Sequence, residues 1–573
     1  MNLLIQIKEN LANTFVSIIF IFSTLFTFVL GELFFYTPNG VDHIYHSKYL
    51  SYFLNLSENT YTGFGLIYYY IIALVSHLRI DEVNNLNAVH FMNSSIHTAN
   101  FLLYLLGIIG IYYLLRKNLF SKTTILIALT LNNFLIPVFI MRSILKPEIF
   151  AFSLFPWIIL GLDKYFKLNS LKNFLLVVIP LSVMLTIKGS VTGMIIIILL
   201  IRYSKYLKTN FKKHLLCFFI LVFCFSLISL ETNNVNDFNL LEHNFTGVDD
   251  KYNNKADTKF LFNINGWDMI FNPVFPYHNN SLISITLLDT FGDYFNVFID
   301  YEEHLFIYDI NHEYTNNLNY NKSFNYGKYL VHYLGVFLAI IFYSLAIFFS
   351  AKDKKYLEFY LGPIVGIFIL SVSSFGFPFN HFDPNTGDTL KSNYYSFLIA
   401  VSFIFIVVKL FKKINLLNFF ISLLLIFIFF FSLGFPKSEN SEINFFLEEK
   451  IEVSLACEVI SIFLKNTDFN DCNNKVKKTC DYNIYSNSAK NFLNIEKNNL
   501  SLNKDNPLLF EGSDEKLTKV TSSNVCEKYI EDGVQLYNPV SKGLRSLPPI
   551  NMIYLLLTLF SITYYFYDLN SKK

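Results

Sequence analysis

The chain has 573 residues, of which 53% are hydrophobic, 18% aromatic and 16% charged. A soluble protein of this length carries nearer a quarter charged residues, so the composition excludes an ordinary soluble globular protein. Several apolar runs approach the ~20 residues that a helix needs to cross a bilayer. The net charge of +1 indicates no class of partner, and nucleic acid is not suggested.

The apolar runs are continuous, as in "FVSIIFIFSTLFTFVL" (15–30) and "LLNFFISLLLIFIFFFSLGF" (416–435). Strands of a membrane β-barrel would alternate apolar and polar residues instead. The pattern therefore predicts an all-α polytopic membrane protein. No small-residue cleavage site follows the first run, so we interpret it as an uncleaved first helix.

The hydropathy pattern predicts about twelve transmembrane helices. We expect them near residues 12–35, 97–115, 121–140, 149–164, 172–187, 190–203, 214–231, 329–350, 356–375, 394–411, 415–434 and 550–567. With the N-terminus in the cytoplasm, the short basic loops "RKNLFSK", "DKYFKLNSLK", "RYSKYLKTNFKKH", "AKDKK" and "KLFKK" all lie inside. This is the bias that the positive-inside rule describes.

The stretch 63–78, "GFGLIYYYIIALVSHL", is also apolar. Counting it as a crossing would invert every later loop and break the charge pattern. We therefore expect a helix that lies at the outer interface or re-enters it, since tyrosine is enriched in interfacial segments.

Four segments then face outside: 36–96, 232–328, 376–393 and 435–549. The predicted domains are a transmembrane domain over 1–434, a small extracytoplasmic domain over 435–549, and a final helix with a cytoplasmic tail over 550–573. The extracytoplasmic domain holds four cysteines, which fits two disulfides in an oxidising compartment: Cys457, Cys472, Cys480 and Cys526. Four free thiols are the alternative, and a zinc site is disfavoured because no CxxC pair occurs.

Four cations lie at outer helix ends, where the usual bias does not place them: Arg142, Lys146, Lys188 and Lys391. Cations that recur on one side of the bilayer, close to its surface, suit an anionic ligand such as a lipid phosphate. The alternative is that these side chains only snorkel toward water from helix ends.

Acids and histidines accompany these cations in the outer segments. Asp42 follows the first span, with His43 and His46 beside it. These three residues are also a candidate set of metal ligands. Glu148 follows Pro147, where it suits the positive end of a helix. Asp289 and Asp293 are spaced to share one helix face, and Asp388 precedes Lys391 by three residues.

The order of these motifs resembles that of a known family. The motifs are "NGVDHIYHSKYL", "TGFGLIYYYIIAL", "FIMRSILKPEIFAFSLFPWIIL", "TIKGSVTGMIIIILLI" and "GDTLKSNYYSFLI". Together they resemble the GT-C glycosyltransferases, which include protein O-mannosyltransferase, aminoarabinose-transferase and RgtA/B/C/D-like groups. The resemblance covers roughly residues 10–410 at the level of organisation, and 435 onward has no counterpart in it.

The resemblance implies a GT-C-like bundle that moves a sugar from a polyprenyl-phosphate donor to a lipid, glycan or protein acceptor with inversion. It makes Asp42 the general base, although His43 stands where the family often has a second acid. Arg142, Lys146, Lys188 and Lys391 would bind the donor phosphate. The remaining outer residues are substrate-binding candidates: His43, His46, Tyr69, Glu148, Asp289, Asp293, Asp388 and Tyr394. The predicted partners are this donor, the acceptor and membrane lipids; no cofactor is implied, and a divalent metal is not required.

Three other functions stay open at this point. A carrier or flippase would place ionisable residues nearer the bilayer midplane and have matching halves. A glycan polymerase or ligase would use lipid-linked substrates but transfer a whole glycan. A non-enzymatic scaffold would act through its outer domain. The frequent Asn, Lys, Ile and Phe suggest a bacterium, hence a plasma membrane with the site facing outward.

Overall fold

The computed structural model describes residues 2–34, 46, 49–50, 52–55, 64–78, 88–207, 209, 211–236, 282–292, 326–375, 391–411, 423–424 and 544–571. Every element in this part of the chain is a helix. The first nine are α1 (Asn2–Phe34), α3 (Leu66–Leu78), α4 (Ala88–Lys117), α5 (Lys122–Asn133), α6 (Ile136–Ser143), α7 (Glu148–Leu168), α8 (Leu171–Leu185), α9 (Gly189–Leu207) and α10 (Phe211–Asn236). The others are α14 (Leu282–Thr290), α15 (Tyr326–Lys352), η3 (Lys354–Tyr356), α16 (Leu357–Phe375), η5 (Ser392–Tyr395), α17 (Ser396–Leu410) and α25 (Pro549–Asn570).

The chain is an all-helical, multi-pass membrane protein. Within the described residues, nine helices are long and apolar enough to cross a bilayer, or ten if the bent pair α5–α6 is one span. The predicted number of about twelve is not reached there. Helix α8 has 15 residues, which gives it a length of about 22 Å against a hydrocarbon core of about 30 Å. Apart from residues 423–424, the span predicted at 415–434 lies outside the described residues.

The predicted single span 121–140 is broken into α5 and α6. The two helices meet at an angle of 71°. Pro137 lies in the first turn of α6, and in a continuous helix its ring would clash with the carbonyl of Asn133. The backbone therefore turns at Phe134 and Leu135, and α6 points in a new direction.

Helix α7 lies at the centre of the bundle and is buried along most of its length. Its closest neighbour is α4, which packs against it through two glycines. A Cβ on Gly107 would lie 2.5 Å from the ring of Phe152, and one on Gly110 would lie 2.7 Å from Pro156. The two backbones approach this closely because small residues leave room between membrane helices.

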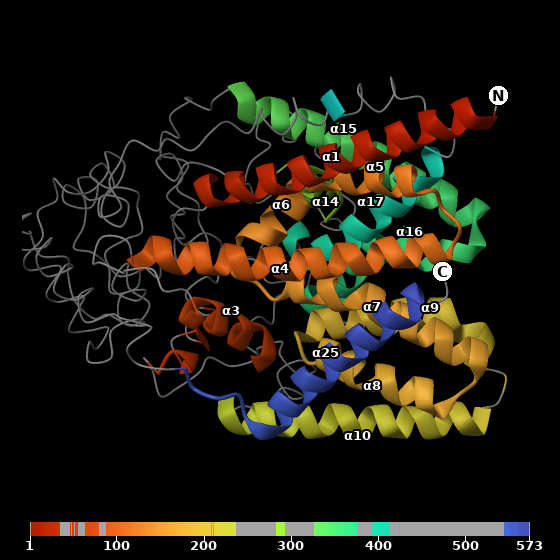
Figure 1. Ribbon diagram of the computed structural model, residues 1–573. Helices are drawn as coiled ribbons and strands as arrows, with labels where there is room; N and C mark the ends of the chain where they lie inside the picture. The colour runs from red at the N-terminus through yellow and green to blue at the C-terminus, as the bar shows by residue number, and fades with distance from the viewer. Residues whose placement is uncertain are drawn as a thin grey trace, which may run out of the picture.

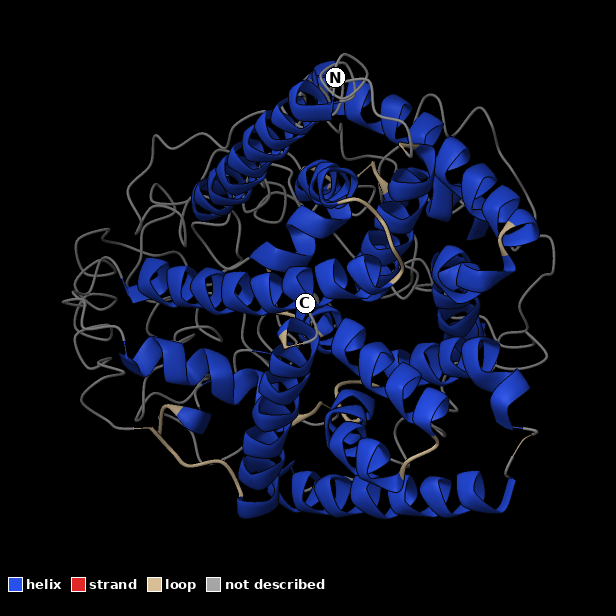
Figure 2. Ribbon diagram, turned by 45° about the vertical axis from the view of Figure 1, so that its right-hand side comes forward, coloured by secondary structure: helices blue, strands red, loops and turns tan. Residues whose placement is uncertain are grey.

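The outer helices present apolar side chains to their surroundings. Exposed large side chains occur along α1 and α10, including Phe22 on α1 and Phe223 on α10, which are 66% and 63% exposed. Figure 2 shows these long helices around the periphery of the bundle. Because lipid tails are apolar, such faces are typical of helices that contact a bilayer.

Helices α1 and α4 run in opposite directions across the view of Figure 1, and α3 lies toward the end at which α1 stops. Helix α3 has 13 residues, too few for the ~20 that a crossing needs. It adds no crossing between α1 and α4, as the charge pattern predicted. Both chain termini lie toward the opposite end of the bundle from α3 (Figure 1).

Candidate functional site

Three predicted cations lie in short connections at one end of the bundle. Lys146 lies between α6 and α7, Lys188 between α8 and α9, and Lys391 directly before η5. The sequence sets these turns locally. Pro147 precedes α7 and cannot continue a helix from α6, while α8 ends at Leu185 and α9 restarts at Gly189.

Two of these lysines contact one aromatic ring. The Nζ of Lys188 lies 3.8 Å from the centroid of the Tyr394 ring, and the Nζ of Lys146 lies 4.5 Å from it. Lys391 is one helical turn before this tyrosine, and its carbonyl accepts a hydrogen bond from the Tyr394 N–H at 3.1 Å. Lysine ammonium groups are attracted to the face of an aromatic ring. We call Lys146, Lys188, Lys391 and Tyr394 the basic–aromatic cluster.

Two carboxylates lie at the edge of the basic–aromatic cluster. Glu148, in the first turn of α7 as predicted, is 1% exposed. Its Oε1 lies 3.3 Å from the Nζ of Lys188, and its Oε2 has no hydrogen-bond partner. Asp289 on α14 accepts a hydrogen bond from the backbone N–H of Ser392 at 2.5 Å. This bond ties α14 to the start of η5.

A group of aromatic side chains lies beside Lys188, and we call it the aromatic wall: His46, Tyr49, Phe64 and Tyr69. Phe64 lies 5.5 Å from its Nζ, and the ring of His46 lies 4.9 Å from Phe64. The His46 Nδ1 and the Tyr69 hydroxyl are hydrogen-bonded at 2.5 Å, and Tyr69 stacks on Tyr49 at 4.2 Å. Two residues predicted to contact substrate, His46 and Tyr69, are therefore brought together.

The wall is anchored to the α8–α9 turn by Gly65. Its N–H donates to the Ile187 carbonyl at 3.3 Å, and a Cβ at this position would lie 2.8 Å from the Thr186 carbonyl oxygen. Only glycine fits this approach. The segment that begins α3 is thereby held against the turn that carries Lys188.

A chain of hydrogen bonds lies beside the basic–aromatic cluster and joins α3 and α4 to the segment that precedes Lys146. The Tyr68 hydroxyl donates to Asn100 at 3.1 Å, and the Asn100 amide donates to the Ile144 carbonyl at 2.9 Å. Burial raises the pKa of the Tyr68 hydroxyl well above its usual range, and the negative charge of Glu148 raises it further.

Arg142 does not join the other three predicted cations. It lies in the last turn of α6 and lines a hollow with residues of α1 and α4. Its guanidinium carbon lies 4.6 Å from the centroid of the Tyr104 ring. Arg142 therefore has neighbours different from those of the basic–aromatic cluster.

Several predicted site residues lie outside the described residues, and what was expected of them stays a prediction. They are Asp42, His43, Asp293, Asp388, Cys457, Cys472, Cys480 and Cys526. Within the described part, no group of three His, Cys, Asp or Glu side chains is arranged to hold a metal ion.

A charged network at the other end of the bundle was not predicted. Arg202 on α9 donates two hydrogen bonds to Asp163 on α7 from its Nη2, at 2.9 and 3.0 Å, and its Nη1 pairs with Glu358 on α16. Lys409 on α17 pairs with Asp353 beside η3. The sequence carried one signal for this network. Asp163 and Glu358 are acidic residues at the ends of apolar spans, where the adjoining loops are basic.

The comparisons with known proteins concern a segment in the second half of the chain. Residues 328–464 match the model of a family described as 7TM diverse intracellular signalling. The matched range is about a quarter of the chain, and it includes α16, η5 and α17 and nearly all of α15. No curated protein and no solved structure matches the chain.

This match corrects the functional interpretation of the sequence. The GT-C resemblance and the glycosyltransferase activity are wrong, because the matched segment is similar to a signalling membrane domain. The misleading feature was the set of cations at helix ends on one side of the membrane. Such cations suit any protein that binds an anion there, so their order along the chain does not identify an enzyme.

Proposed function

We propose that this chain is a multi-pass membrane receptor of intracellular signalling. The observation that carries the proposal is the match of residues 328–464 to a family described as 7TM diverse intracellular signalling. In this proposal the basic–aromatic cluster is the sensory site, and the charged network at the opposite end of the bundle is where a change of state is passed on.

The matched segment contacts both places, which supports a coupling between them. Lys391 and Tyr394, at the start of the candidate crossing Ser392–Leu410, belong to the basic–aromatic cluster. Lys409, near its end, pairs with Asp353. A helix of this length spans about 28 Å. A displacement of η5 would therefore be carried by one rigid element to the other membrane face.

The chemistry of the cluster favours an anionic ligand. Lys146 and Lys391 are each 3% exposed, and Lys146 and Lys188 share the ring of Tyr394. Bringing two ammonium groups to one ring costs repulsion, which a bound anion relieves. A ligand shifts a two-state equilibrium only by its differential affinity for the two states. Contact with Lys391 and Tyr394 would supply that difference by fixing η5 in one position.

The proposal includes an orientation. The N-terminus lies in the cytoplasm of a bacterium, the basic loops face inward, and the basic–aromatic cluster faces outward. Helix α8 and the segment 415–434 complete twelve crossings, which agrees with both termini lying toward one end of the bundle (Figure 1). Segment 435–549 is then an outer domain with four cysteines.

A complementation experiment tests the proposal. The gene is deleted in its own host and restored as wild type, Lys188→Gln or Lys205→Gln. Lys205 is an exposed lysine on α9 outside the cluster and serves as the matched control. We expect the deletion to change the transcript profile, and wild type and Lys205→Gln to restore it. Lys188→Gln, present at an equal membrane level, should not.

Envelope glycans and lipids are measured by mass spectrometry in the same strains. A transcript profile that is unchanged by deletion would contradict the receptor proposal. A profile that Lys188→Gln restores fully would contradict the assignment of the sensory site. An altered glycan without any change in transcripts would also contradict the receptor.

A further inference from the structure

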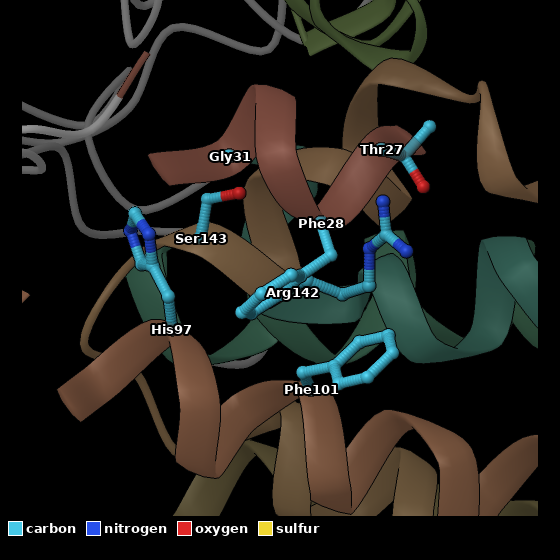
Figure 3. Close-up of a pocket in the computed structure, with 7 residues that line it drawn as sticks. All are labelled: Thr27, Phe28, Gly31, His97, Phe101, Arg142 and Ser143. Atoms are coloured by element: carbon cyan, nitrogen blue, oxygen red, sulfur yellow. The ribbon is translucent and has the colours of Figure 1, made fainter. Parts of the chain in front are cut away.

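A hollow separate from the basic–aromatic cluster lies between α1, α4 and α6. It is lined by Thr27, Phe28, Gly31, His97, Phe101, Arg142 and Ser143, and it is narrow and partly open to the outside. In the view of Figure 3 the guanidinium of Arg142 lies toward Thr27, and His97 lies toward Ser143. The hollow thus has polar groups from three helices.

Arg142 is the unusual member of this lining. Arg142 is 5% exposed, and its Nε, Nη1 and Nη2 all lack a hydrogen-bond partner. Burying a charge without hydrogen bonds is unfavourable. The Tyr104 ring at 4.6 Å and the Phe139 ring at 5.9 Å offset only part of that cost.

The polar groups nearby are engaged elsewhere. The Thr27 hydroxyl donates to the Ser23 carbonyl of its own helix at 2.8 Å, and the Tyr104 hydroxyl donates to Asn133 at 2.7 Å. His97 lies 3.6 Å from the carboxylate of Glu32. None of these groups therefore pairs with the guanidinium of Arg142, whose five N–H donors an oxyanion in the hollow could accept from.

We propose that this hollow binds a carboxylate group, held by the guanidinium of Arg142. A planar carboxylate accepts two parallel hydrogen bonds from guanidinium, and it is smaller than a phosphate, which suits a narrow space. The site is independent of the receptor proposal, because it uses none of the residues of the basic–aromatic cluster.

The surroundings favour an acid with a long apolar chain. The rings of Phe28 and Phe101 lie on one wall with their centroids 4.7 Å apart and their planes tilted by 38°. Leu25 and Val29 on α1 are 52% and 54% exposed, and Leu102 on α4 is 54% exposed. An apolar chain attached to the carboxylate would lie along these side chains, within the bilayer.

Binding of hexadecanoate to the purified full chain tests the proposal, in nanodiscs of zwitterionic phosphatidylcholine. Hexadecanol has the same apolar chain without the charge. We expect saturable binding of the acid and at least about tenfold weaker binding of the alcohol, which corresponds to loss of a charge-assisted hydrogen bond. Acetate distinguishes the source: if it displaces hexadecanoate at equal concentration, the carboxylate site stands and its ligand is a water-soluble acid.

Two variants separate the site from general stability. Gly31→Ala leaves Arg142 unchanged but adds a methyl 3.1 Å from the Ser143 hydroxyl, which narrows the hollow. Gly362→Ala is the matched control, since its Cβ meets Leu398 at an ordinary 3.5 Å. We expect Gly31→Ala to weaken hexadecanoate binding by at least about tenfold, Arg142→Gln to abolish it, and Gly362→Ala to leave it unchanged.

Equal binding of hexadecanoate and hexadecanol by the wild-type chain would overturn the proposal without reference to any variant. So would unchanged hexadecanoate binding by Arg142→Gln. Failure of the receptor proposal would leave these results unaffected, because no signalling readout enters them.

Discussion

Lys188 shows how a charge is held near the end of this bundle. The Tyr394 ring lies 3.8 Å from its Nζ, and the Glu148 carboxylate lies 3.3 Å away. The two partners are not equally protected, since the Glu148 side chain is 1% exposed and that of Lys188 is 20% exposed. The carboxylate therefore depends on the lysine more than the lysine depends on the carboxylate.

We predict that Glu148→Gln lowers the free energy of unfolding by about 2 to 3 kcal/mol. Removing one partner of a buried pair usually costs about 3 to 5 kcal/mol, because the other is left uncompensated, and partial exposure of Lys188 places the effect below that range. The measurement is unfolding of the purified chain in mixed detergent micelles containing increasing sodium dodecyl sulfate.

Asp568→Asn provides the comparison. Asp568 pairs with Lys164 at 3.0 Å, with the two side chains 21% and 15% exposed. A pair that reaches water contributes less, so we expect a loss below about 1 kcal/mol. Equal losses in both variants would show that burial of Glu148 has no energetic consequence.

At the scale of helices, the position of α7 depends on how closely α4 approaches it. Gly107 and Gly110 face Phe152, Pro156 and Trp157 at distances that leave no room for a Cβ. The contact lies between the end that carries Glu148 and the end that carries Asp163. Helix α7 thus holds one residue of each charged region, and its packing fixes both.

We predict that Gly107→Ala destabilises the protein by about 1 to 3 kcal/mol, because a Cβ 2.5 Å from the Phe152 ring forces α4 and α7 apart. Gly362→Ala should be neutral or stabilising by up to about 1 kcal/mol, since it gains helix propensity without a clash. Thermal unfolding of both variants in the same detergent is the measurement. A stabilised Gly107→Ala would contradict the described packing.

Individual helices show what local sequence could and could not predict. The start of α7 at Glu148 follows from Pro147, and the turn at Lys188 follows from two apolar runs separated by a polar stretch. The bend between α5 and α6 was missed although Pro137 is a local signal for it. What the local sequence does not show is that the Asn133 side chain at the bend bonds to Tyr104 and to Ser23 of α1. Such partners, distant in sequence, are invisible to a hydropathy pattern.

At the scale of the whole molecule, the alternation of charge predicted that α3 adds no crossing, while the membrane face of each loop stays a prediction. It also predicted that Lys146, Lys188 and Lys391 lie at one end. It could not predict that Lys146 and Lys188 share the ring of Tyr394 or that Arg142 faces a different hollow, because both depend on helix packing. The charge pattern did not determine function. The cations at one end of the bundle suggested a glycosyltransferase, and the match over 328–464 overturns that interpretation.

The central claim is that the basic–aromatic cluster is coupled to the opposite end of the bundle. Hydrogen–deuterium exchange of the full chain in nanodiscs, with citrate or inorganic phosphate added, tests it most directly. The account predicts that at least one anion slows exchange at 391–395 and also changes exchange at 353–358, in Lys205→Gln but not in Lys188→Gln. No change at either segment, or protection at 391–395 with none at 353–358, would contradict it.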